Sequence, residues 1–285
     1  MRSIVITGTS TGIGHASAKV LLAKGFRVFG SVRKQADADR LKMEFGANFT
    51  ALQFDVTDEA AVTAAAREVR DALKGETLAG LVNNAGVAVA GPALELSIDE
   101  FRRQMDVNVI GPVIVTQAFG PLLGADRLLK GPPGRIVMIS SVAGQHGNPL
   151  MAPYAMSKHA IEGFSESLRR ELALFGIGVV IIGPGAVKTP IWQKAEQVEV
   201  AQFSHSPYRP ALERLRAFML AFGAKGLEAE KVGQLVHTAL TTANPKVRYA
   251  IVPNPMQMLL QSVLPKRVVD GIIEKRLGLT PTSKG

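Results

Sequence analysis

Short apolar runs rich in β-branched residues recur from the start of the chain to about residue 182. Runs of this kind are typical of buried parallel strands, because a strand covered on both faces has no polar side. Longer stretches of helical composition separate them. This alternation predicts a doubly wound α/β fold, in which helices cover both faces of a parallel sheet. The predicted strands are residues 3–7, 27–32, 50–54, 78–82, 135–139 and 177–182.

The stretches between these strands carry helix-start and helix-stop signals. Gly25 stands where the first helix should end, and Asp58 or Thr57 is placed to cap the third. Parallel strands bring their carboxyl ends to one edge of the sheet, where the ligands of such folds bind. The predicted helices are residues 15–24, 37–45, 58–73, 97–123 and 154–175.

Composition narrows the class of protein. The chain has 285 residues, 47% hydrophobic and 20% charged, which fits one soluble globular domain spanning residues 1–285. The net charge of +9 comes from scattered basic residues rather than a basic run, which argues against a nucleic-acid partner. There is no cysteine, and we see no cluster of metal ligands. Met1-Arg2 leads directly into the first strand, and no 18 consecutive residues are apolar, so we expect a cytoplasmic protein without a transmembrane segment.

A glycine-rich turn joins the first predicted strand to the first helix. Its glycines are Gly8, Gly12 and Gly14, and Ser17 stands where a G-x-G-x-x-G motif would place its last glycine. Glycines let the backbone approach a phosphate closely, and a helix N-terminus supplies N–H donors. The turn therefore indicates a nucleotide site, with an ordinary tight strand-to-helix turn as the alternative.

The residues after the second predicted strand bear on the choice of cofactor. In dinucleotide-binding folds an acidic residue near this point accepts hydrogen bonds from the ribose 2′-hydroxyl. Here Val32 is followed by Arg33 and Lys34. A guanidinium suits a 2′-phosphate, which it can bind through paired hydrogen bonds. We therefore predict NADP(H) in preference to NAD(H), with two solvated charges at a strand end as the alternative.

Tyr154 and Lys158 are the candidate catalytic pair. Residues four apart on a helix lie one turn apart on the same face, and Pro153 suits the start of that helix. A phenol has a pKa of ~10, but an ammonium ~4–6 Å away favours the phenolate and lowers that pKa. Such a pair can donate and accept a proton near neutral pH. The same pattern also fits a helix with a solvated lysine.

Other polar residues follow the predicted strands directly. Residues 83–86 end the fourth strand, Ser141 follows the fifth, and the turn at residues 183–190 follows the sixth. All of them should meet at the carboxyl edge of the sheet. Asn108 lies instead inside an apolar stretch of predicted helix, where its amide needs partners. A structural hydrogen bond and an active-site role are the two interpretations of Asn108.

Together these motifs, over about residues 3–190, resemble those of the single-domain short-chain dehydrogenase/reductases and occur in that family's order. A looser similarity links residue 33 and the stretch 245–252 to the retinol and 17β-hydroxysteroid dehydrogenases of the family. The matching motifs are Thr7-Gly8-x-x-x-Gly12-Ile13-Gly14, Asp55, Asn83-Asn84-Ala85-Gly86, Asn108, Ser141 with Tyr154-x-x-x-Lys158, and Pro184-Gly185 with Thr189.

The resemblance implies a Rossmann-like sheet of about seven strands, the last at residues 248–252, and a nicotinamide cofactor that exchanges hydride with a carbonyl/alcohol pair. Tyr154 would be the general acid/base, Ser141 would bind the same oxygen, Lys158 would lower the tyrosine pKa and hold the ribose, and Asn108 would hold a water. The implied catalytic residues are Asn108, Ser141, Tyr154 and Lys158. The implied cofactor-binding residues are Gly8, Thr9, Ser10, Gly12, Ile13, Gly14, Arg33, Asp55, Val56, Asn84, Ala85, Gly86, Tyr154, Lys158, Pro184, Val187 and Thr189.

The last third of the chain indicates a substrate region. We expect a substrate flap at about residues 190–226, whose aromatic and apolar side chains favour a lipophilic substrate, and a C-terminal extension at about residues 253–285. Residues 256–277 should pack against the body or another subunit, with contact to a membrane surface as the alternative. By resemblance, the helices at residues 97–123 and 153–175 should form a homodimer or homotetramer.

Two other functions fit parts of the pattern. A non-catalytic NADP(H)-sensing protein could share the fold, although the set of Ser141, Tyr154 and Lys158 argues against it. Nucleotide-sugar epimerases and enoyl reductases of the same family are disfavoured, because their glycine or tyrosine–lysine spacings differ from those found here.

Overall fold

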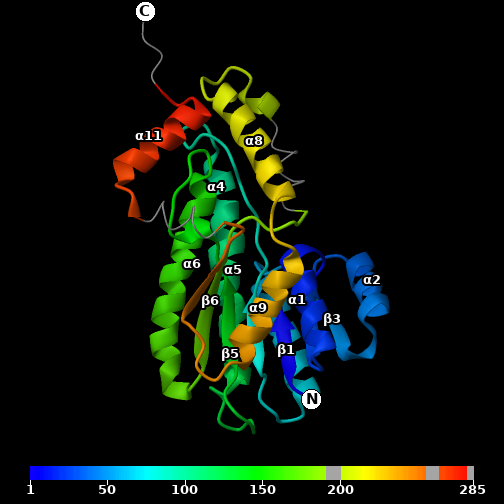
Figure 1. The fold of residues 1–285 in the computed structure, drawn as a ribbon. Coiled ribbons are helices and arrows are strands. Elements are labelled where there is room, and N and C mark those ends of the chain that lie inside the picture. Colours follow the sequence, from blue (N-terminus) through cyan, green and yellow to red (C-terminus); the bar gives the residue numbers. More distant parts are fainter. Residues whose placement is uncertain (191–199, 255–262, 281–285) are drawn as a thin grey trace, which may run out of the picture.

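A sheet of seven parallel strands lies at the centre of the molecule (Figure 1). The structure is a computed structural model that describes residues 1–190, 200–254 and 263–280. All six strands expected from the apolar runs are present, and so is the seventh. The strands are β1 Ser3–Ile6, β2 Arg27–Val32, β3 Phe49–Gln53, β4 Gly80–Asn83, β5 Arg135–Ile139, β6 Gly178–Pro184 and β7 Arg248–Ile251.

The strand order is β3-β2-β1-β4-β5-β6-β7. The chain builds outward from β1 to β2 and β3, and then crosses back to pair β4 with the free side of β1. Connections therefore leave the neighbouring strands β1 and β4 in opposite directions. At such a switch point a crevice opens beyond the carboxyl ends of the strands, where ligands of doubly wound sheets bind.

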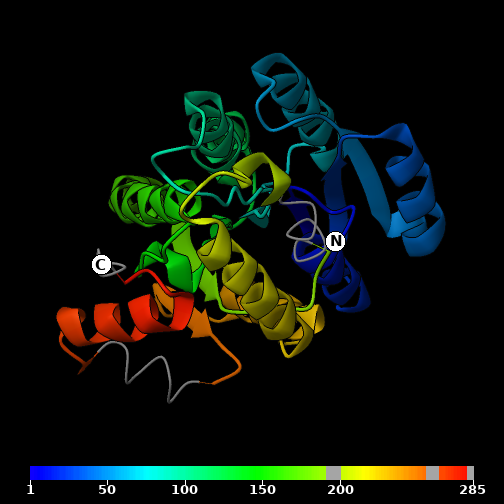
Figure 2. The ribbon, with the colours of Figure 1, turned by 90° about the horizontal axis from the view of Figure 1, so that it is seen from above.

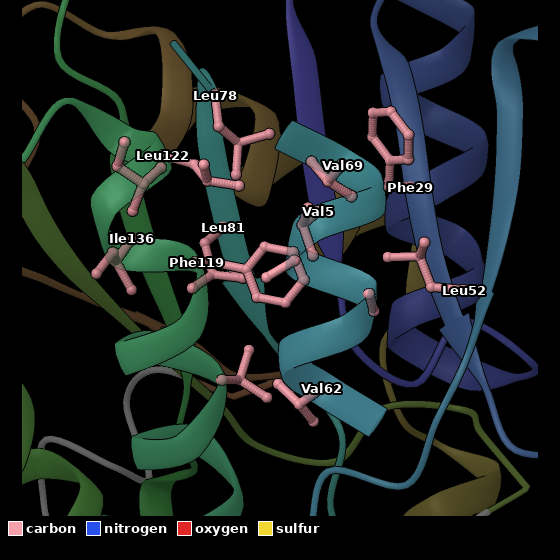
Figure 3. Packing of buried hydrophobic residues seen from close by; sticks show 14 of the residues in the cluster. Val5, Phe29, Leu52, Val62, Val69, Leu78, Leu81, Phe119, Leu122 and Ile136 are labelled. Carbon is pink, nitrogen blue, oxygen red and sulfur yellow. The ribbon is translucent and has the colours of Figure 1, made fainter. Parts of the chain in front are cut away.

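Two hydrophobic clusters cover the two faces of the sheet. On one face α3 (Glu59–Leu73), α5 (Gly111–Phe119) and α6 (Ala152–Glu171) pack over Val5. Figure 3 shows this cluster, with Phe119 of α5 beside Val5 and Leu81. On the other face α1 (Gly12–Ala23), α2 (Gln35–Phe45) and α9 (Ala229–Thr241) pack over Ile4 and Ile6. Successive strand residues point to opposite faces, so a buried strand must be apolar at every position.

The predicted helix at residues 97–123 is irregular. It consists of α4 (Ile98–Met105), a π-helical turn (Asp106–Ile110), α5 and a 3₁₀ turn (Gly120–Leu123). A π turn adds one residue to a helical turn and is common at functional sites. The first helix also begins at Gly12 rather than at residue 15, so two glycines of the turn belong to its first turn.

The same helical run is the one segment of the described residues that is long and apolar enough to cross a membrane. Half of its most apolar window, however, is buried within the fold, and Val115 and Phe119 belong to the core. Core helices of globular proteins satisfy the same criterion, so the run is weak evidence for a transmembrane segment.

A third cluster lies beyond the carboxyl ends of the strands. It joins α8 (Arg209–Ala224) and α11 (Lys266–Leu277) to the loop before α6, through Leu215, Leu277 and Leu150. Figures 1 and 2 show α8 and α11 above this edge of the sheet. Packing of the C-terminal segment against the body is therefore confirmed for α11, whereas residues 255–262 lie outside the described residues. Val268 and Ile272 of α11 remain exposed.

Candidate active site

A cavity of about 470 Å³ opens beyond the carboxyl ends of the strands. Its walls come from the turn after β1, the ends of β2, β4, β5 and β6, the start of α6, and the two helices α8 and α11. Most of the residues expected to bind cofactor or substrate meet there. Those that line the cavity are Gly8, Ser10, Gly12, Ile13, Arg33, Asp55, Val56, Asn84, Ala85, Gly86, Ser141, Tyr154, Lys158, Pro184, Val187 and Thr189.

The glycine turn has the geometry of a phosphate cradle. Gly8 and Gly12 have φ angles of 71° and 63°, in the left-handed region that favours glycine. A Cβ atom on Gly14 would lie 2.2 Å from the Gly8 carbonyl oxygen, so no larger residue fits there. Thr11, the N-cap of α1, makes no side-chain capping hydrogen bond, so its side chain does not satisfy the first-turn N–H groups. These groups fit the pyrophosphate of a dinucleotide.

Asn84 holds the turn against the end of β4. Its side-chain Nδ2 donates to the carbonyl oxygens of Thr7 and Gly8, at 2.8 and 3.1 Å. In return, the Thr7 hydroxyl oxygen accepts hydrogen bonds from the backbone N–H groups of Asn84 and Ala85. The two strands that flank the switch point are thus locked together where the cavity begins.

Arg33 and Asp55 form the polar end of the cavity beside β2 and β3. The Arg33 Nη1 lies 3.6 Å from the Asp55 Oδ2, and the two side chains are 68% and 38% exposed. Asp55 is oriented by Thr57, whose backbone N–H and hydroxyl both donate to Oδ1. An exposed ion pair of this kind contributes little to the free energy of unfolding. The guanidinium still has N–H donors that can bind a phosphate.

Tyr154 and Lys158 lie on α6, one turn apart, as their spacing predicts. The Lys158 Nζ is 5.8 Å from the centroid of the Tyr154 ring and donates to the Ile139 carbonyl oxygen at 2.9 Å. Ser141 lies two residues after the end of β5, and its Oγ accepts from the Ala143 N–H and donates to the Pro184 carbonyl oxygen. A phenol, a hydroxyl and an ammonium therefore line one region of the cavity.

Burial shifts the pKa values of Lys158 and Tyr154. It lowers the pKa of the Lys158 ammonium to about 8, and the Glu162 carboxylate partly opposes that shift. The protein packed around Tyr154 raises the pKa of its phenol, although a hydrogen bond with the Ser141 side chain lowers it somewhat. The expectation that Lys158 depresses the Tyr154 pKa is thus wrong for this structure, because the desolvation of a phenolate dominates.

Asn108 lies in the π turn and is 2% exposed. Its Oδ1 accepts from the Val87 N–H, while Nδ2 donates to the Val87 carbonyl oxygen and to the Ser157 hydroxyl. Gln104, one helical turn earlier, also holds the segment that follows β4. Its side-chain oxygen accepts a hydrogen bond from the Val89 N–H, and its side-chain nitrogen donates one to the Val87 carbonyl oxygen. The structural interpretation of Asn108 is therefore supported: its amide fixes the segment after β4 beside α6.

A part-buried ion pair lies behind Ser141 and Lys158. The Nε of Arg248, on β7, donates to both carboxylate oxygens of Glu162 at 3.1 and 3.0 Å, and each side chain is 16% exposed. The Arg248 Nη2 donates to the Ser141 carbonyl oxygen. The edge strand β7 is thereby connected to both Ser141 and the turn of α6 that follows Lys158.

Not every expected residue reaches the cavity. Thr9, Gly14 and Asn108 act from behind its wall, and the Thr9 hydroxyl donates to the Ser31 carbonyl oxygen. The motifs did not reveal several residues that complete the site, because serine, glutamine, glutamate and arginine carry no distinctive spacing at these positions. They are Ser31, Gln104, Ser157, Glu162, Arg248 and Arg276.

A protein-family model and several known proteins match this chain. Residues 2–199 match the family model described as short chain dehydrogenase. The chain is 39% identical over 278 residues to an NADPH-dependent 3-dehydrocapnine reductase from Ornithobacterium rhinotracheale, covering 97% of this chain and 98% of the relative. It is 34% identical to human retinol dehydrogenase 5 over 290 residues, covering 95% and 87% of the two chains.

Solved structures share the fold. A short-chain dehydrogenase/reductase from Burkholderia phymatum, determined in complex with NAD, superposes with a TM-score of 0.77 at 25% identity and covers 95% of both chains.

Proposed function

The chain belongs to the short-chain dehydrogenase family, and from that premise we propose that it uses NADP(H) to interconvert a carbonyl and an alcohol on a lipophilic substrate, with Tyr154 as the general acid and base. One observation carries the proposal. Tyr154, Lys158 and Ser141 line the same cavity as the glycine turn and Arg33. A proton donor and a dinucleotide cradle therefore face one shared space.

The cofactor supplies or accepts the hydride when it is bound, and the chain supplies the proton and the charge stabilisation. In the reducing direction Tyr154 donates its phenolic proton to the substrate oxygen as negative charge develops on it. Its raised pKa keeps the phenol protonated at neutral pH, which suits this direction. Ser141 donates a hydrogen bond to the same oxygen and stabilises that charge.

Lys158 has a positioning role in this proposal. Its ammonium is held by the Ile139 carbonyl oxygen and lies beside the Tyr154 ring. By family resemblance it binds the ribose next to the nicotinamide. Asn108, besides fixing the segment after β4, would hold a water that links Lys158 to solvent. Val187 and Thr189 would contact the carboxamide. Since the Lys158 pKa is about 8, reduction should weaken above that pH as the ammonium loses its proton.

The choice of NADP(H) rests on Arg33 and on the similarity of this chain to a relative that uses NADPH. Arg33 stands where an acidic residue would repel a 2′-phosphate, and its side chain is largely exposed. The relative from Ornithobacterium is NADPH-dependent by name, whereas the Burkholderia structure holds NAD. NAD(H) is therefore the alternative cofactor that the kinetics must compare.

The cavity wall supports a lipophilic substrate. Leu215, Phe218 and Met219 of α8 and Ile273 and Leu277 of α11 line it. They belong to the proposed substrate flap at about residues 190–226 and to the C-terminal extension at about residues 253–285, within one domain. Trp192, also expected in the flap, lies outside the described residues.

Assembly and location are part of the proposal. Ile98 on α4, Ile110 in the π turn and Met156 on α6 are exposed apolar side chains on the helices expected to meet a second subunit. Their exposure supports a homodimer or homotetramer, and the composition supports a cytoplasmic protein.

The proposed function is tested by a substrate screen. The purified protein is mixed with NADPH and a panel of aldehydes and ketones, and loss of the cofactor absorbance is followed. Saturable oxidation of NADPH by at least one carbonyl is expected. Binding of NADPH without turnover of any carbonyl or alcohol would favour the sensing protein instead.

A further inference from the structure

The charged residues that line the cavity lie in three places. Among the described residues these are Arg33, Asp55, Lys158 and Arg276. Arg33 and Asp55 pair with each other after β2 and β3, and Lys158 lies beside Tyr154. Arg276 comes from α11, which Figures 1 and 2 show on the opposite side of the molecule from β3 and α2. Arg276 is therefore remote from the end of the cavity that would hold the adenosine.

Arg276 is exposed at the rim of the cavity, and apolar side chains lie beside it. Its guanidinium carbon lies 4.4 Å from the centroid of the Phe218 ring. Ile273 and Leu277 of its own helix line the cavity beside it. No carboxylate of the described residues lies within ion-pair distance of the guanidinium. Stacking on a ring face leaves the in-plane N–H donors of an arginine available to another group.

The end of α11 is fixed in place. Leu277 is 6% exposed and packs in the cluster that contains Leu150 and Met151, just before Tyr154. From α8, the Arg214 Nη1 donates to the Leu277 carbonyl oxygen at 3.0 Å. Gly278, with a φ of 70°, ends the helix. Arg276 thus belongs to a wall that is anchored to the loop before α6.

We propose that Arg276 binds an anionic group on the substrate, such as a carboxylate, sulfonate or phosphate, while the carbonyl of the same molecule lies at Tyr154. This inference rests on the proposed function and specifies its substrate class: a molecule with an apolar body, a reducible carbonyl and a negatively charged end. An arginine prefers such oxyanions because its planar fork binds two oxygens at once.

The test compares an acid with its neutral ester. Kinetics are measured with NADPH and either 3-oxooctanoate or methyl 3-oxooctanoate, for the wild type, Arg276→Gln and Lys275→Gln. Lys275 is exposed like Arg276 and lies on the same helix but does not line the cavity, so Lys275→Gln is the matched control. We expect the wild type to prefer the acid, and Arg276→Gln to lower the acid-to-ester ratio of kcat/KM about tenfold, mainly through KM. Lys275→Gln should leave that ratio unchanged.

A second experiment measures binding and does not require the ligand to be a good substrate. Octanoate, octane-1-sulfonate, octyl phosphate and octan-1-ol are titrated into the NADP⁺ complex, and the thermal shift is followed. At least one anion should stabilise the wild type more than octanol does and lose that advantage in Arg276→Gln; the most effective anion identifies the group.

The two proposals fail differently. Equal acid-to-ester ratios in the wild type and Arg276→Gln, or equal stabilisation by octanol and every anion, would overturn the role of Arg276 while carbonyl reduction stands. NADPH left unoxidised by every carbonyl would overturn the proposed function, and the binding experiment would still decide whether Arg276 recognises an anion.

Discussion

Replacing Glu162 with glutamine should shift the pH dependence of carbonyl reduction. Glu162 lies one turn after Lys158 on α6, and its carboxylate raises the pKa of the Lys158 ammonium against the effect of burial. It also binds Arg248 through both of its oxygens. In Glu162→Gln the favourable charge is lost and the Arg248 guanidinium loses this carboxylate partner, so the Lys158 pKa should fall below about 8.

The size of this shift follows from the geometry. The Cβ atoms of residues one helical turn apart lie ~6 Å from each other, and if the two charges are separated by a similar distance they interact by about 3 kcal/mol at an effective dielectric constant of ~20. That energy corresponds to about two pH units. Because Arg248 already neutralises much of the carboxylate, we expect a shift of about one unit. Breaking this part-buried pair, whose side chains are each 16% exposed, should also lower the free energy of unfolding by about 2 kcal/mol.

The assay is kcat/KM for carbonyl reduction as a function of pH. A lysine of lowered pKa is charged below that pKa, so activity should decline as the pH rises through it. The alkaline limb should therefore move about one unit lower in Glu162→Gln. Glu166→Gln is the control, since Glu166 lies one turn further along α6, is 54% exposed and pairs with Arg170. An unshifted limb in a folded Glu162→Gln protein would refute the link between Glu162 and Lys158.

Three further predictions concern the cofactor site and the assembly. Arg33→Ala should lower the NADPH-to-NADH ratio of kcat/KM about tenfold, since one charge-assisted contact to the 2′-phosphate is lost; kinetics with both cofactors measure this, and an unchanged ratio would remove Arg33 from the site. Gly14→Ala should destabilise the protein by about 2 kcal/mol, because its Cβ would lie 2.2 Å from the Gly8 carbonyl oxygen. Thermal unfolding should show no such loss for Gly163→Ala in α6, where an added Cβ meets nothing within 4 Å. Light scattering should find a homodimer or homotetramer, and a monomer at micromolar concentration would contradict the proposed contact through Ile98, Ile110 and Met156.

Periodicity alone predicted the body of the fold. The inner strands β1, β4, β5 and β6 are almost entirely buried on both faces, so each appears in the sequence as a mainly apolar run, whereas the edge strand β3 is only partly buried. The last strand, β7, is an edge strand whose residues are only partly buried or exposed, and its position came from family resemblance rather than from its pattern. The break in the helix at residues 98–123 was missed, because a π turn leaves the composition of a helix unchanged.

The sequence could predict those residues of the candidate site that follow a strand of the parallel sheet. The glycine turn, Asn84 and Ser141 follow strands directly, so parallel topology brings them to one edge. Contacts between distant segments could not be predicted: Arg248 meets Glu162 across 86 positions, and Arg276 reaches the cavity only because α11 folds back onto α8. The pKa of Tyr154 was predicted in the wrong direction because the spacing with Lys158 reveals a charge but not the burial that outweighs it.

The central claim is that Tyr154 donates and accepts the proton. Tyr154→Phe keeps the ring and removes the ionisable group, so kcat should fall by about 10²-fold or more. Tyr249→Phe is the matched control, because Tyr249 lies on β7 outside the cavity and accepts a hydrogen bond from the Lys246 N–H.

The decisive measurement is therefore kcat for NADPH-dependent carbonyl reduction by Tyr154→Phe beside Tyr249→Phe, with NADPH affinity titrated for both. The account predicts nearly unchanged affinity in both variants and loss of turnover in Tyr154→Phe alone. Full turnover in Tyr154→Phe would contradict it.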